Sequence, residues 1–238
     1  MSLARTLARR GYGTRREVEA LIAARRVTSG SGTPWRDADT PAPGDVLVDG
    51  EPLDPPAGSV LLLHKPVGYV CSTSDRPPLV YELLPARFPR RDPVMATVGR
   101  LDADTSGLLL LTDDGALNHR LTSPRSHVSK TYEATLAEPL RGDETARFAS
   151  GTLLLSGEST PCLPAALTVL SDRRVAVTLH EGRYHQVRRM FAAVGNHVTA
   201  LHRSAFGSLT LGDLELGRWR VLTPAEVIAL AASAVRSK

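Results

Sequence analysis

The stretch GRLDADTSGLLLLTDDG, residues 99–115, decides the fold more than any other part of the sequence. Its four consecutive leucines, Leu108–Leu111, predict a short strand that is buried on both faces in the centre of a sheet. Gly107 stands at the start of this run, and Asp102 and Asp104 precede it in a segment that predicts a loop. The stretch therefore predicts a central strand with an acidic loop leading into it.

The carboxylates at the two ends of this strand have different explanations. Asp113 and Asp114 precede a predicted helix, where carboxylates cap free N–H groups at the positive end of the helix dipole. Asp102 and Asp104 lie where no helix start requires them. They suggest a glycosidase pair or a metal site, but a loop does not guarantee facing carboxylates and no histidine lies nearby. One nucleophilic carboxylate with a local arginine, Arg100, is the simplest chemical interpretation.

Length and composition allow one large domain, or a large domain with a small appendage, because the chain has 238 residues and 42% hydrophobic content. The only lysines are Lys65, Lys130 and Lys238, so arginine supplies almost all the positive charge of a chain with net charge +4. Arginine forms bidentate pairs with phosphate and stacks on bases, which favours a nucleic-acid partner. High genomic G+C content would produce the same bias without any functional cause.

The cysteines and the apolar segments indicate the compartment. Cys71 and Cys162 are isolated and match no metal spacing, which is typical of reduced, buried thiols. No apolar run reaches 18 residues, and Arg5, Arg9 and Arg10 interrupt the N-terminal segment. We therefore expect a soluble, cytoplasmic protein that has no membrane partner and is a monomer.

Residues 1–58 differ from the remainder and predict a small module with its linker. Leu3 and Leu7 suggest a first short helix, and Thr14-Arg15-Arg16-Glu17 is a capping box that opens a second. A short strand is predicted at Val46–Val48. This order resembles the S4-type RNA-binding module named after a ribosomal protein, although that module's tight V-x-V-N-G turn is replaced here by the looser segment 27–32.

Charge is segregated within this module. Residues 1–30 hold seven arginines and two glutamates, a net charge of +5, whereas residues 31–58 carry a net charge of −5. A basic two-helix face can neutralise phosphates without reading sequence, although charged runs often only solvate helix surfaces. The candidate RNA contacts in this module are Arg5, Arg9, Arg15 and Arg16.

Residues 59–238 predict a catalytic-sized domain in which strands outnumber helices and do not alternate strictly with them. This pattern favours an α+β fold with a mixed or antiparallel central sheet over a doubly wound one. The predicted strands are Val60–Leu63, Leu108–Leu111, Tyr132–Leu136, Leu167–Leu170, Val175–Leu179, Val198–Leu201 and Trp219–Leu222, and the predicted helices are 115–121, 143–150, 183–194 and 224–235.

The motif G-R-L-D-x-D-T-x-G-L-L-L-L-T-x-D-G and three further stretches resemble the RsuA-type pseudouridine synthases. The further stretches are HKPVGYVCST at 64–73, SHVSKTYEATL at 126–136 and EGRYHQVRRMFAAVGNHVTALHR at 181–203. With the S4-like start, the resemblance covers nearly the whole chain. The last stretch most resembles the small-subunit branch, which isomerises one uridine of 16S rRNA, because large-subunit relatives tend to differ around YHQ and HVTALHR.

The resemblance implies a pseudouridine-synthase catalytic domain with Asp102 as its essential carboxylate. A nucleophilic carboxylate must be ionised, and burial disfavours the charged form, so a nearby cation is needed. In the family a basic residue of the third motif supplies it, and the matching position is Arg188. On the predicted helix Arg188 borders the apolar face beside Tyr184, whereas Arg189 points away, to solvent or phosphate.

The remaining site residues follow from the same resemblance. Tyr132 matches the tyrosine that stacks on the target base, and Leu201 matches the apolar residue on its other side; both are otherwise plausible core residues. Arg100 matches an arginine that contacts RNA around the everted nucleotide, and Arg189 and Arg203 are further candidates for such contacts. Lys65 is predicted to close a strand and line the cleft.

The histidines and the partners complete the set of expectations. His185, His197 and His202 are spaced poorly for one zinc site, so RNA or structural hydrogen bonding is expected for them. The resemblance implies no metal and no cofactor, and it names 16S rRNA or the assembling small ribosomal subunit as the partner. A large-subunit synthase and a non-catalytic assembly factor remain as alternatives.

Overall fold

The computed structural model describes residues 2–42, 44–72, 76 and 78–234. The chain divides into two compact units. One comprises Met1–Ser59, Tyr81–Ala96 and Thr112–Asp114, and the other comprises Val60–Val80, Thr97–Leu111 and Gly115–Lys238. The division after residue 58 that the sequence suggests stays a prediction about domains, because the first unit also takes in two later segments.

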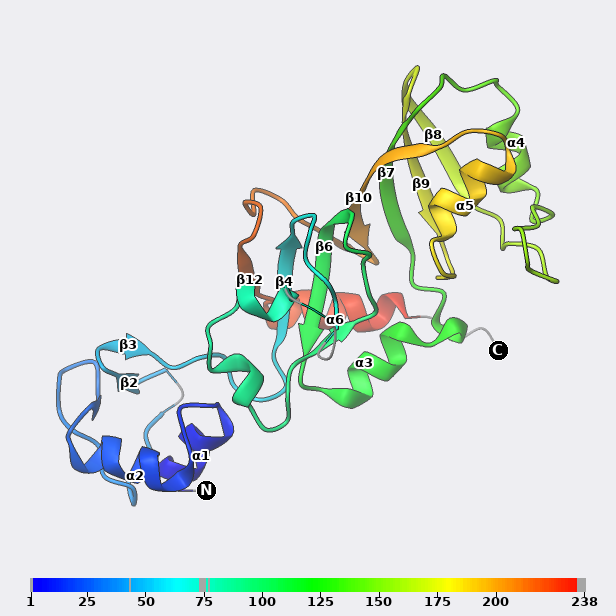
Figure 1. Cartoon of the computed structure of the whole chain (residues 1–238). Coiled ribbons are helices and arrows are strands. Elements are labelled where there is room, and N and C mark those ends of the chain that lie inside the picture. Colours follow the sequence, from blue (N-terminus) through cyan, green and yellow to red (C-terminus); the bar gives the residue numbers. More distant parts are fainter. Residues whose placement is uncertain (1, 43, 73–75, 77, 235–238) are drawn as a thin grey trace. The chain divides into compact units, whose positions relative to one another are not determined.

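The first unit is built on two short helices and a small sheet (Figure 1). Thr14 accepts a hydrogen bond from the backbone N–H of Glu17, and the Glu17 carboxylate accepts one from that of Thr14, so the predicted capping box is confirmed. The core is small and apolar. The elements are α1 (Leu3–Arg9), α2 (Arg15–Ala23), β1 (Val27–Thr28), β2 (Leu47–Val48) and β3 (Glu51–Pro52), with both strand pairs antiparallel, and η2 (Phe88–Arg90).

A buried ion pair ties the later segments of this unit together. Arg91 Nη2 lies 3.1 Å from Asp113 Oδ2, and both side chains are 1% exposed. Asp113 also accepts a hydrogen bond from the backbone N–H of Gly58 at 2.7 Å. The predicted helix-capping role of Asp113 is therefore wrong, because its carboxylate is already committed to a guanidinium and a distant backbone group.

The second unit contains a nine-stranded sheet, which is mixed, one of the two arrangements that the sequence favours. Strand β10 runs parallel to β6 on one side and antiparallel to β7 on the other. The strand order is β12 (Trp219–Val221), β4 (Val60–Lys65), β6 (Thr105–Thr112), β10 (Val198–Phe206), β7 (Lys130–Leu136), β9 (Arg174–Leu179) and β8 (Ala166–Ser171), with β5 (Ala96–Val98) on β6 and β11 (Leu209–Thr210) on β10.

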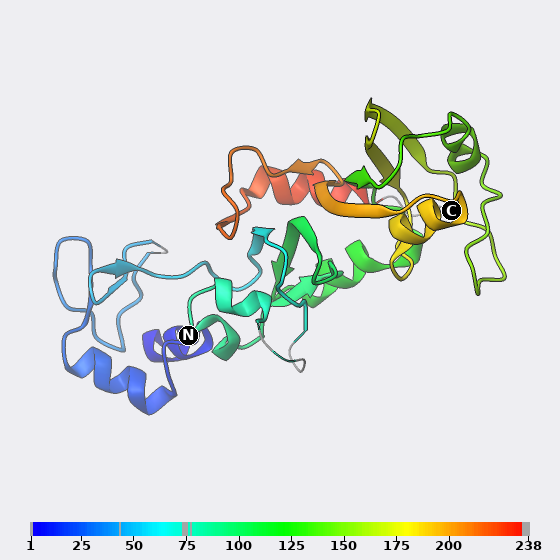
Figure 2. The same cartoon turned by 45° about the horizontal axis from the view of Figure 1, so that its top comes forward.

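Helices cover the two halves of this sheet separately (Figures 1 and 2). α3 (Gly115–Thr122) and α6 (Pro224–Ser233) share an apolar core with β4 and β6. α4 (Glu144–Ala149) and α5 (Gln186–Ala193) share a second core with β7, β8 and β9. Strand β10 contributes to both cores, so the middle of the sheet, where β6, β10 and β7 meet, lies between two packed regions. Short 3-10 turns are η1 (Val80–Leu83) and η3 (Pro124–Ser126).

Gly107 explains why β6 and β10 lie unusually close. It pairs with Arg203 across the parallel ladder and has a φ of +118°. A Cβ at this position would lie 2.3 Å from the Arg203 carbonyl oxygen, so a side chain here would collide with the neighbouring backbone. The glycine in the opening motif thus lets β6 lie directly beside β10.

Two features are absent from the described part of the chain. None of its helices is both long and apolar enough to span a bilayer. Within the same residues, no group of three or more histidine, cysteine, aspartate or glutamate side chains is arranged to hold a metal ion.

Candidate active site

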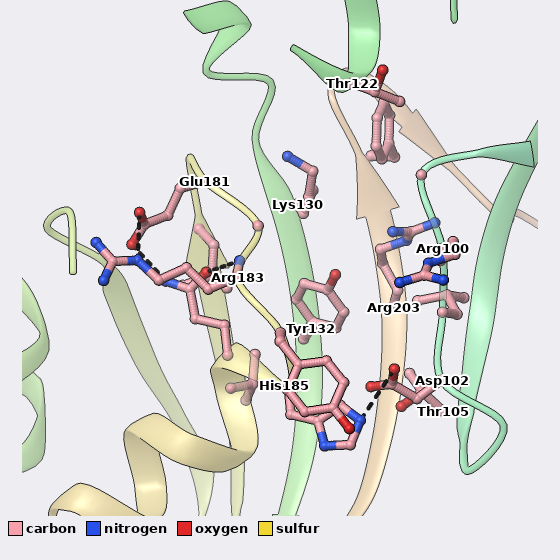
Figure 3. Close-up of a pocket in the computed structure, with 18 of the residues that line it drawn as sticks. Arg100, Asp102, Thr105, Thr122, Lys130, Tyr132, Glu181, Arg183, His185 and Arg203 are labelled. Carbon is pink, nitrogen blue, oxygen red and sulfur yellow. Dashed lines mark hydrogen bonds and ion pairs between the residues drawn. The ribbon is translucent and has the colours of Figure 1, made fainter. Parts of the chain in front are cut away.

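A pocket of about 510 Å³ opens at the middle of the sheet in the second unit. Its walls come from the loop before β6, from β7 and β10, and from the segment that joins β9 to α5. Figure 3 shows Tyr132 and Lys130 along one wall, with Asp102, Arg100 and Arg203 along the other. Asp102, Arg100, Tyr132 and Leu201, four of the residues that the sequence selects, all line this one pocket.

The backbone of the loop that carries Asp102 is fixed by Lys65. The Lys65 ammonium is fully buried and donates to the carbonyl oxygens of Pro66, Asp102 and Thr105 at 2.8–3.0 Å. Burial lowers the pKa of Lys65, and the nearby thiol of Cys71 and the carboxylate of Asp102 oppose that shift. Lys65 therefore positions the loop through its carbonyls and leaves the Asp102 side chain available to the pocket.

The carboxylate of Asp102 is 39% exposed, and a histidine faces it. His185 Nε2 lies 3.4 Å from Asp102 Oδ1 (Figure 3). His185 has a φ of +49°, in the left-handed region, so α5 begins at Gln186 and not at residue 183 as the periodicity predicts. This turn directs the imidazole towards Asp102, and the RNA or structural hydrogen bonding expected of His185 stays a prediction.

Tyr184 extends the same wall of the pocket. Its ring stacks on the His185 imidazole with centroids 3.9 Å apart and an interplanar angle of 17°. Tyr184 is 72% exposed, which is unusual for a large aromatic side chain. The stack presents an open aromatic face at the mouth of the pocket.

Arg188 pairs with a different carboxylate from the predicted one. Its Nη2 lies 2.8 Å from Asp104 Oδ2, and its Nη1 donates to the Val198 carbonyl at 2.9 Å. The predicted ion pair between Arg188 and Asp102 is therefore wrong for this structure. The bond to β10 holds the guanidinium beside the second aspartate of the loop, and His185 lies against the first.

The two residues expected to enclose the base lie in the pocket as predicted. Tyr132 on β7 is half-buried and pairs in register with Arg203 of β10. Leu201 is 7% exposed and lies opposite Thr105 of β6 in the parallel ladder. An aromatic ring and an aliphatic side chain thus reach the pocket from adjacent strands, and Arg100 is exposed at its rim. Their roles towards RNA stay predictions.

Arg203 and Arg189 are placed differently from what the sequence suggests. Arg203 is only 2% exposed and donates through Nε to the Leu108 carbonyl at 2.8 Å, so it is a buried residue of the pocket wall and not a residue of the exposed surface. Arg189 does not point to solvent, because its guanidinium lies 2.9 Å from Glu158 and donates to the Ser156 carbonyl. Glu158 and Ser156 belong to a neighbouring loop, so Arg189 finds its hydrogen-bond acceptors within the protein and not in solvent.

The four arginines selected in the N-terminal module all lie in the first unit. Arg5 and Arg16 are exposed. Arg15 lies 2.9 Å from Glu19, and Arg9 donates to the Asp92 carbonyl at 3.1 Å. Two of the four guanidiniums thus already have partners within the unit, and RNA binding by the four remains a prediction.

Sequence reasoning missed Lys130 as a residue of the site. It lines the pocket two positions before Tyr132, and its pKa is lowered to about 8, mainly by burial and then by the charge of Arg203. The signal was present in the K-x-Y pattern of the SHVSKTYEATL stretch, because residues two apart on a strand face the same side.

Comparison with known proteins identifies the family. The model of the RNA pseudouridylate synthase family matches residues 59–193. The chain is 47% identical to the ribosomal small subunit pseudouridine synthase A of Yersinia pestis over 195 residues, which is 79% of this chain and 80% of the relative. The chain belongs to the RNA pseudouridylate synthase family.

Further relatives agree with this assignment. The ribosomal small subunit pseudouridine synthase A of Escherichia coli strain K12 is 47% identical over 193 residues, or 78% of this chain and 80% of that protein. A crystal structure described as a pseudouridylate synthase matches with a TM-score of 0.69 and 39% identity, covering 97% of this chain and 99% of the other. The α+β pseudouridine-synthase fold predicted from the sequence is therefore confirmed, and the protein is a pseudouridine synthase.

Proposed function

We propose that this protein converts one uridine of 16S ribosomal RNA in the small ribosomal subunit to pseudouridine, with Asp102 as the nucleophile. The observation that carries the proposal is the placement of the Asp102 carboxylate in a pocket that Tyr132 and Leu201 also line. The relatives named as small-subunit pseudouridine synthases support the choice of RNA. These relatives favour 16S rRNA over large-subunit rRNA as the substrate, and a modifying enzyme over a non-catalytic assembly factor.

The reaction needs little beyond these side chains. The N1–C1′ glycosidic bond breaks, the uracil rotates, and a C5–C1′ bond forms; C5 loses a proton and N1 gains one. Atoms and electrons balance within the nucleotide, so no redox cofactor is required. The target uridine must leave its stack to enter the pocket, at a cost of a few kcal/mol that aromatic stacking and phosphate contacts offset.

Each residue of the site has a role in this scheme. Asp102 initiates cleavage of the glycosidic bond, since a carboxylate is a competent nucleophile. Tyr132 stacks on the uracil, and Leu201 packs on its other face. Arg100 at the rim contacts the RNA around the extruded nucleotide. Arg188 acts through its ion pair with Asp104 and so orders the loop that carries the nucleophile.

The N-terminal module, residues 1–58, binds RNA in this proposal, and residues 59–238 perform catalysis. The exposed arginines Arg5 and Arg16 supply phosphate contacts that do not depend on sequence. The protein acts as a monomer in the cytoplasm, on 16S rRNA or on the assembling subunit. Both cysteines, Cys71 and Cys162, are buried and unpaired, which supports a reducing compartment.

The test compares the two ribosomal RNAs directly. Purified protein is incubated with transcribed 16S or 23S rRNA, and the modified position is mapped by chemical labelling of pseudouridine. The proposal predicts one new pseudouridine in 16S rRNA and none in 23S rRNA. Modification of 23S rRNA alone would establish the large-subunit alternative, and binding to 16S rRNA without modification would establish the assembly factor.

A further inference from the structure

Arg203 is a buried cation with too few partners. It is 2% exposed, and Leu108 is its single recorded acceptor among the residues that the structure describes, through Nε. Its Nη2 is buried with no hydrogen-bond partner. A guanidinium offers five N–H donors, and a buried one without a counter-ion is costly. Because Arg203 lines the active-site pocket, an anion that enters the pocket would supply the missing partner.

Lys130 is a second cation that lines the same pocket and lies against the same aromatic ring as Arg203. The Lys130 ammonium lies 5.6 Å from the centroid of the Phe206 ring, and Arg203 Cζ lies 5.3 Å from the same centroid. The recorded hydrogen bond of Lys130 goes to the Val128 carbonyl, at 3.0 Å. Figure 3 shows Lys130 and Arg203 on opposite sides of the pocket near Tyr132.

The carboxylates around the two cations are engaged elsewhere. Glu181 is the acid whose charge acts on Lys130, but it accepts hydrogen bonds from Gln186 and Arg183. Asp102 lies against His185. Within the described residues, no carboxylate lies within ion-pair distance of Lys130 or Arg203. The two cations therefore face the pocket as an uncompensated pair, which agrees with the lowered pKa of Lys130.

We propose that Lys130 and Arg203 form a subsite for one phosphate group of the extruded uridine nucleotide. The inference rests on the proposed function, because it assumes that a uridine enters this pocket. A phosphodiester brings one negative charge and two free oxygens that the two cations can share, whereas the uracil carbonyls are neutral. Arginine matches phosphate oxygens with its planar fork, and lysine adds a point charge.

This subsite gives Lys130 a function distinct from that of its neighbour on β7. Tyr132 contacts the base and Lys130, two positions away on the same face of the strand, contacts the backbone of the same nucleotide. The phosphate then anchors the nucleotide while its base rotates between cleavage and re-addition. A fixed phosphate would keep C1′ beside Asp102 during that step.

The first test measures equilibrium binding of small probes, so it does not depend on turnover. Uridine, uridine 5′-phosphate and uridine 3′-phosphate are titrated into the full-length protein by calorimetry. One of the two nucleotides is expected to bind at least about tenfold more tightly than uridine, since hydrogen bonds to charged groups exceed neutral ones in strength. The tighter of the two identifies which phosphate occupies the subsite. Equal affinity for all three probes would overturn the proposal.

Variants at Lys130 assign the effect to the subsite. Lys130→Gln is expected to remove most of the preference for the nucleotide over uridine and to leave the affinity for uridine unchanged. Lys130→Arg is expected to retain the preference. Arg173→Gln is the matched control, because it removes one positive charge at an exposed position outside the pocket. Loss of preference in the control as well would mean a diffuse charge effect and would contradict the subsite.

A second measurement gives an answer even if uridine binds too weakly to detect. The protein has three lysines, so the side-chain resonance of Lys130 can be resolved by NMR after ¹³C labelling of lysine. The resonance that is missing from the Lys130→Gln spectrum is assigned to Lys130. Inorganic phosphate is expected to shift the Lys130 titration to higher pH, and an unchanged titration at saturating phosphate would overturn the proposal. If phosphate does not bind at Lys130 but 16S rRNA is modified, the subsite is wrong and the proposed function stands. If phosphate binds at Lys130 but 16S rRNA is not modified, only the proposed function is wrong.

Discussion

His185 Nε2 lies 3.4 Å from Asp102 Oδ1, so the imidazole that faces this carboxylate comes from the turn before α5 and not from the helix itself. Both side chains are more than one third exposed, and a partly exposed pair of this kind is worth at most about 1 kcal/mol. The contact therefore orients the carboxylate more than it stabilises the fold.

Replacing His185 is expected to weaken catalysis only modestly. His185→Gln should lower kcat/KM by at most about fivefold, which corresponds to the energy of one exposed ion pair. Steady-state kinetics of the wild type and the variant measures this loss. A loss of several orders of magnitude would mean that His185 takes part in the chemistry.

The Arg188–Asp104 pair should be detectable as an energetic coupling. A double-mutant cycle with Arg188→Gln and Asp104→Asn is expected to show a coupling of about 0.5–1 kcal/mol in unfolding free energy, as partly exposed pairs do. The matched cycle of Arg188→Gln with Asp102→Asn should show none. The opposite result in denaturant titrations would restore the pairing that the family resemblance implies.

Gly107 should tolerate no side chain. Gly107→Ala is expected to destabilise the protein by about 2–4 kcal/mol, because it adds both a strained φ and a collision with the Arg203 backbone. Gly115→Ala is the control, since that glycine has no positive φ and nothing within 4 Å of an added Cβ. Equal midpoints of chemical unfolding for the two variants would contradict the close approach of β6 and β10.

Tyr184 should contribute to RNA affinity by stacking. Tyr184→Ala is expected to weaken binding of a 16S rRNA fragment by about 1–3 kcal/mol, the usual contribution of a base stacked on an aromatic ring. Tyr184→Phe should bind as the wild type does, because it keeps the ring. Filter binding of both variants to one fragment measures the difference, and equal losses would mean that the hydroxyl and not the ring makes the contact.

Affinity for the phosphorylated nucleotide should fall with rising pH. The pKa of Lys130 is about 8 in the free protein, so the amine is charged below that pH and neutral above it. Bound phosphate favours the charged form, and affinity should therefore be level near pH 7 and fall by up to about tenfold per pH unit above pH 8. Lys130→Arg should remove this fall between pH 7 and pH 9.5. A wild-type affinity that does not change over this range would contradict a charged Lys130 in the subsite.

Much of the fold was predictable because periodicity and capping are local. The leucine run predicted β6, and the helix predicted from residue 224 is α6, which begins at Pro224 after a capping box formed by Thr223 and Glu226. The start of α5 was misjudged because His185 adopts a left-handed conformation that apolar spacing does not report. A three-residue error at this helix start concealed the histidine that contacts Asp102.

The pairing of charges was harder to predict than the strands. Asp102 and Asp104 are equally acidic in sequence, and the choice of Arg188 between them depends on the Val198 carbonyl, which only the register of β10 places. Arg203 looked like a surface arginine, yet its position opposite Gly107 in the ladder buries it in the pocket wall. The pairing of distant strands decides which charged groups meet, and local sequence patterns carry little information on that pairing.

The central claim is that the Asp102 carboxylate performs the isomerisation. The most direct measurement is tritium release from 16S rRNA transcribed with uridine labelled at C5, comparing wild type with Asp102→Asn. The variant keeps the shape of the side chain and removes its charge. Our account predicts one equivalent of tritium released by the wild type, and a rate lower by roughly 10⁴-fold or more in the variant, as when other enzymes lose their nucleophile. Equal release by the two proteins would contradict it.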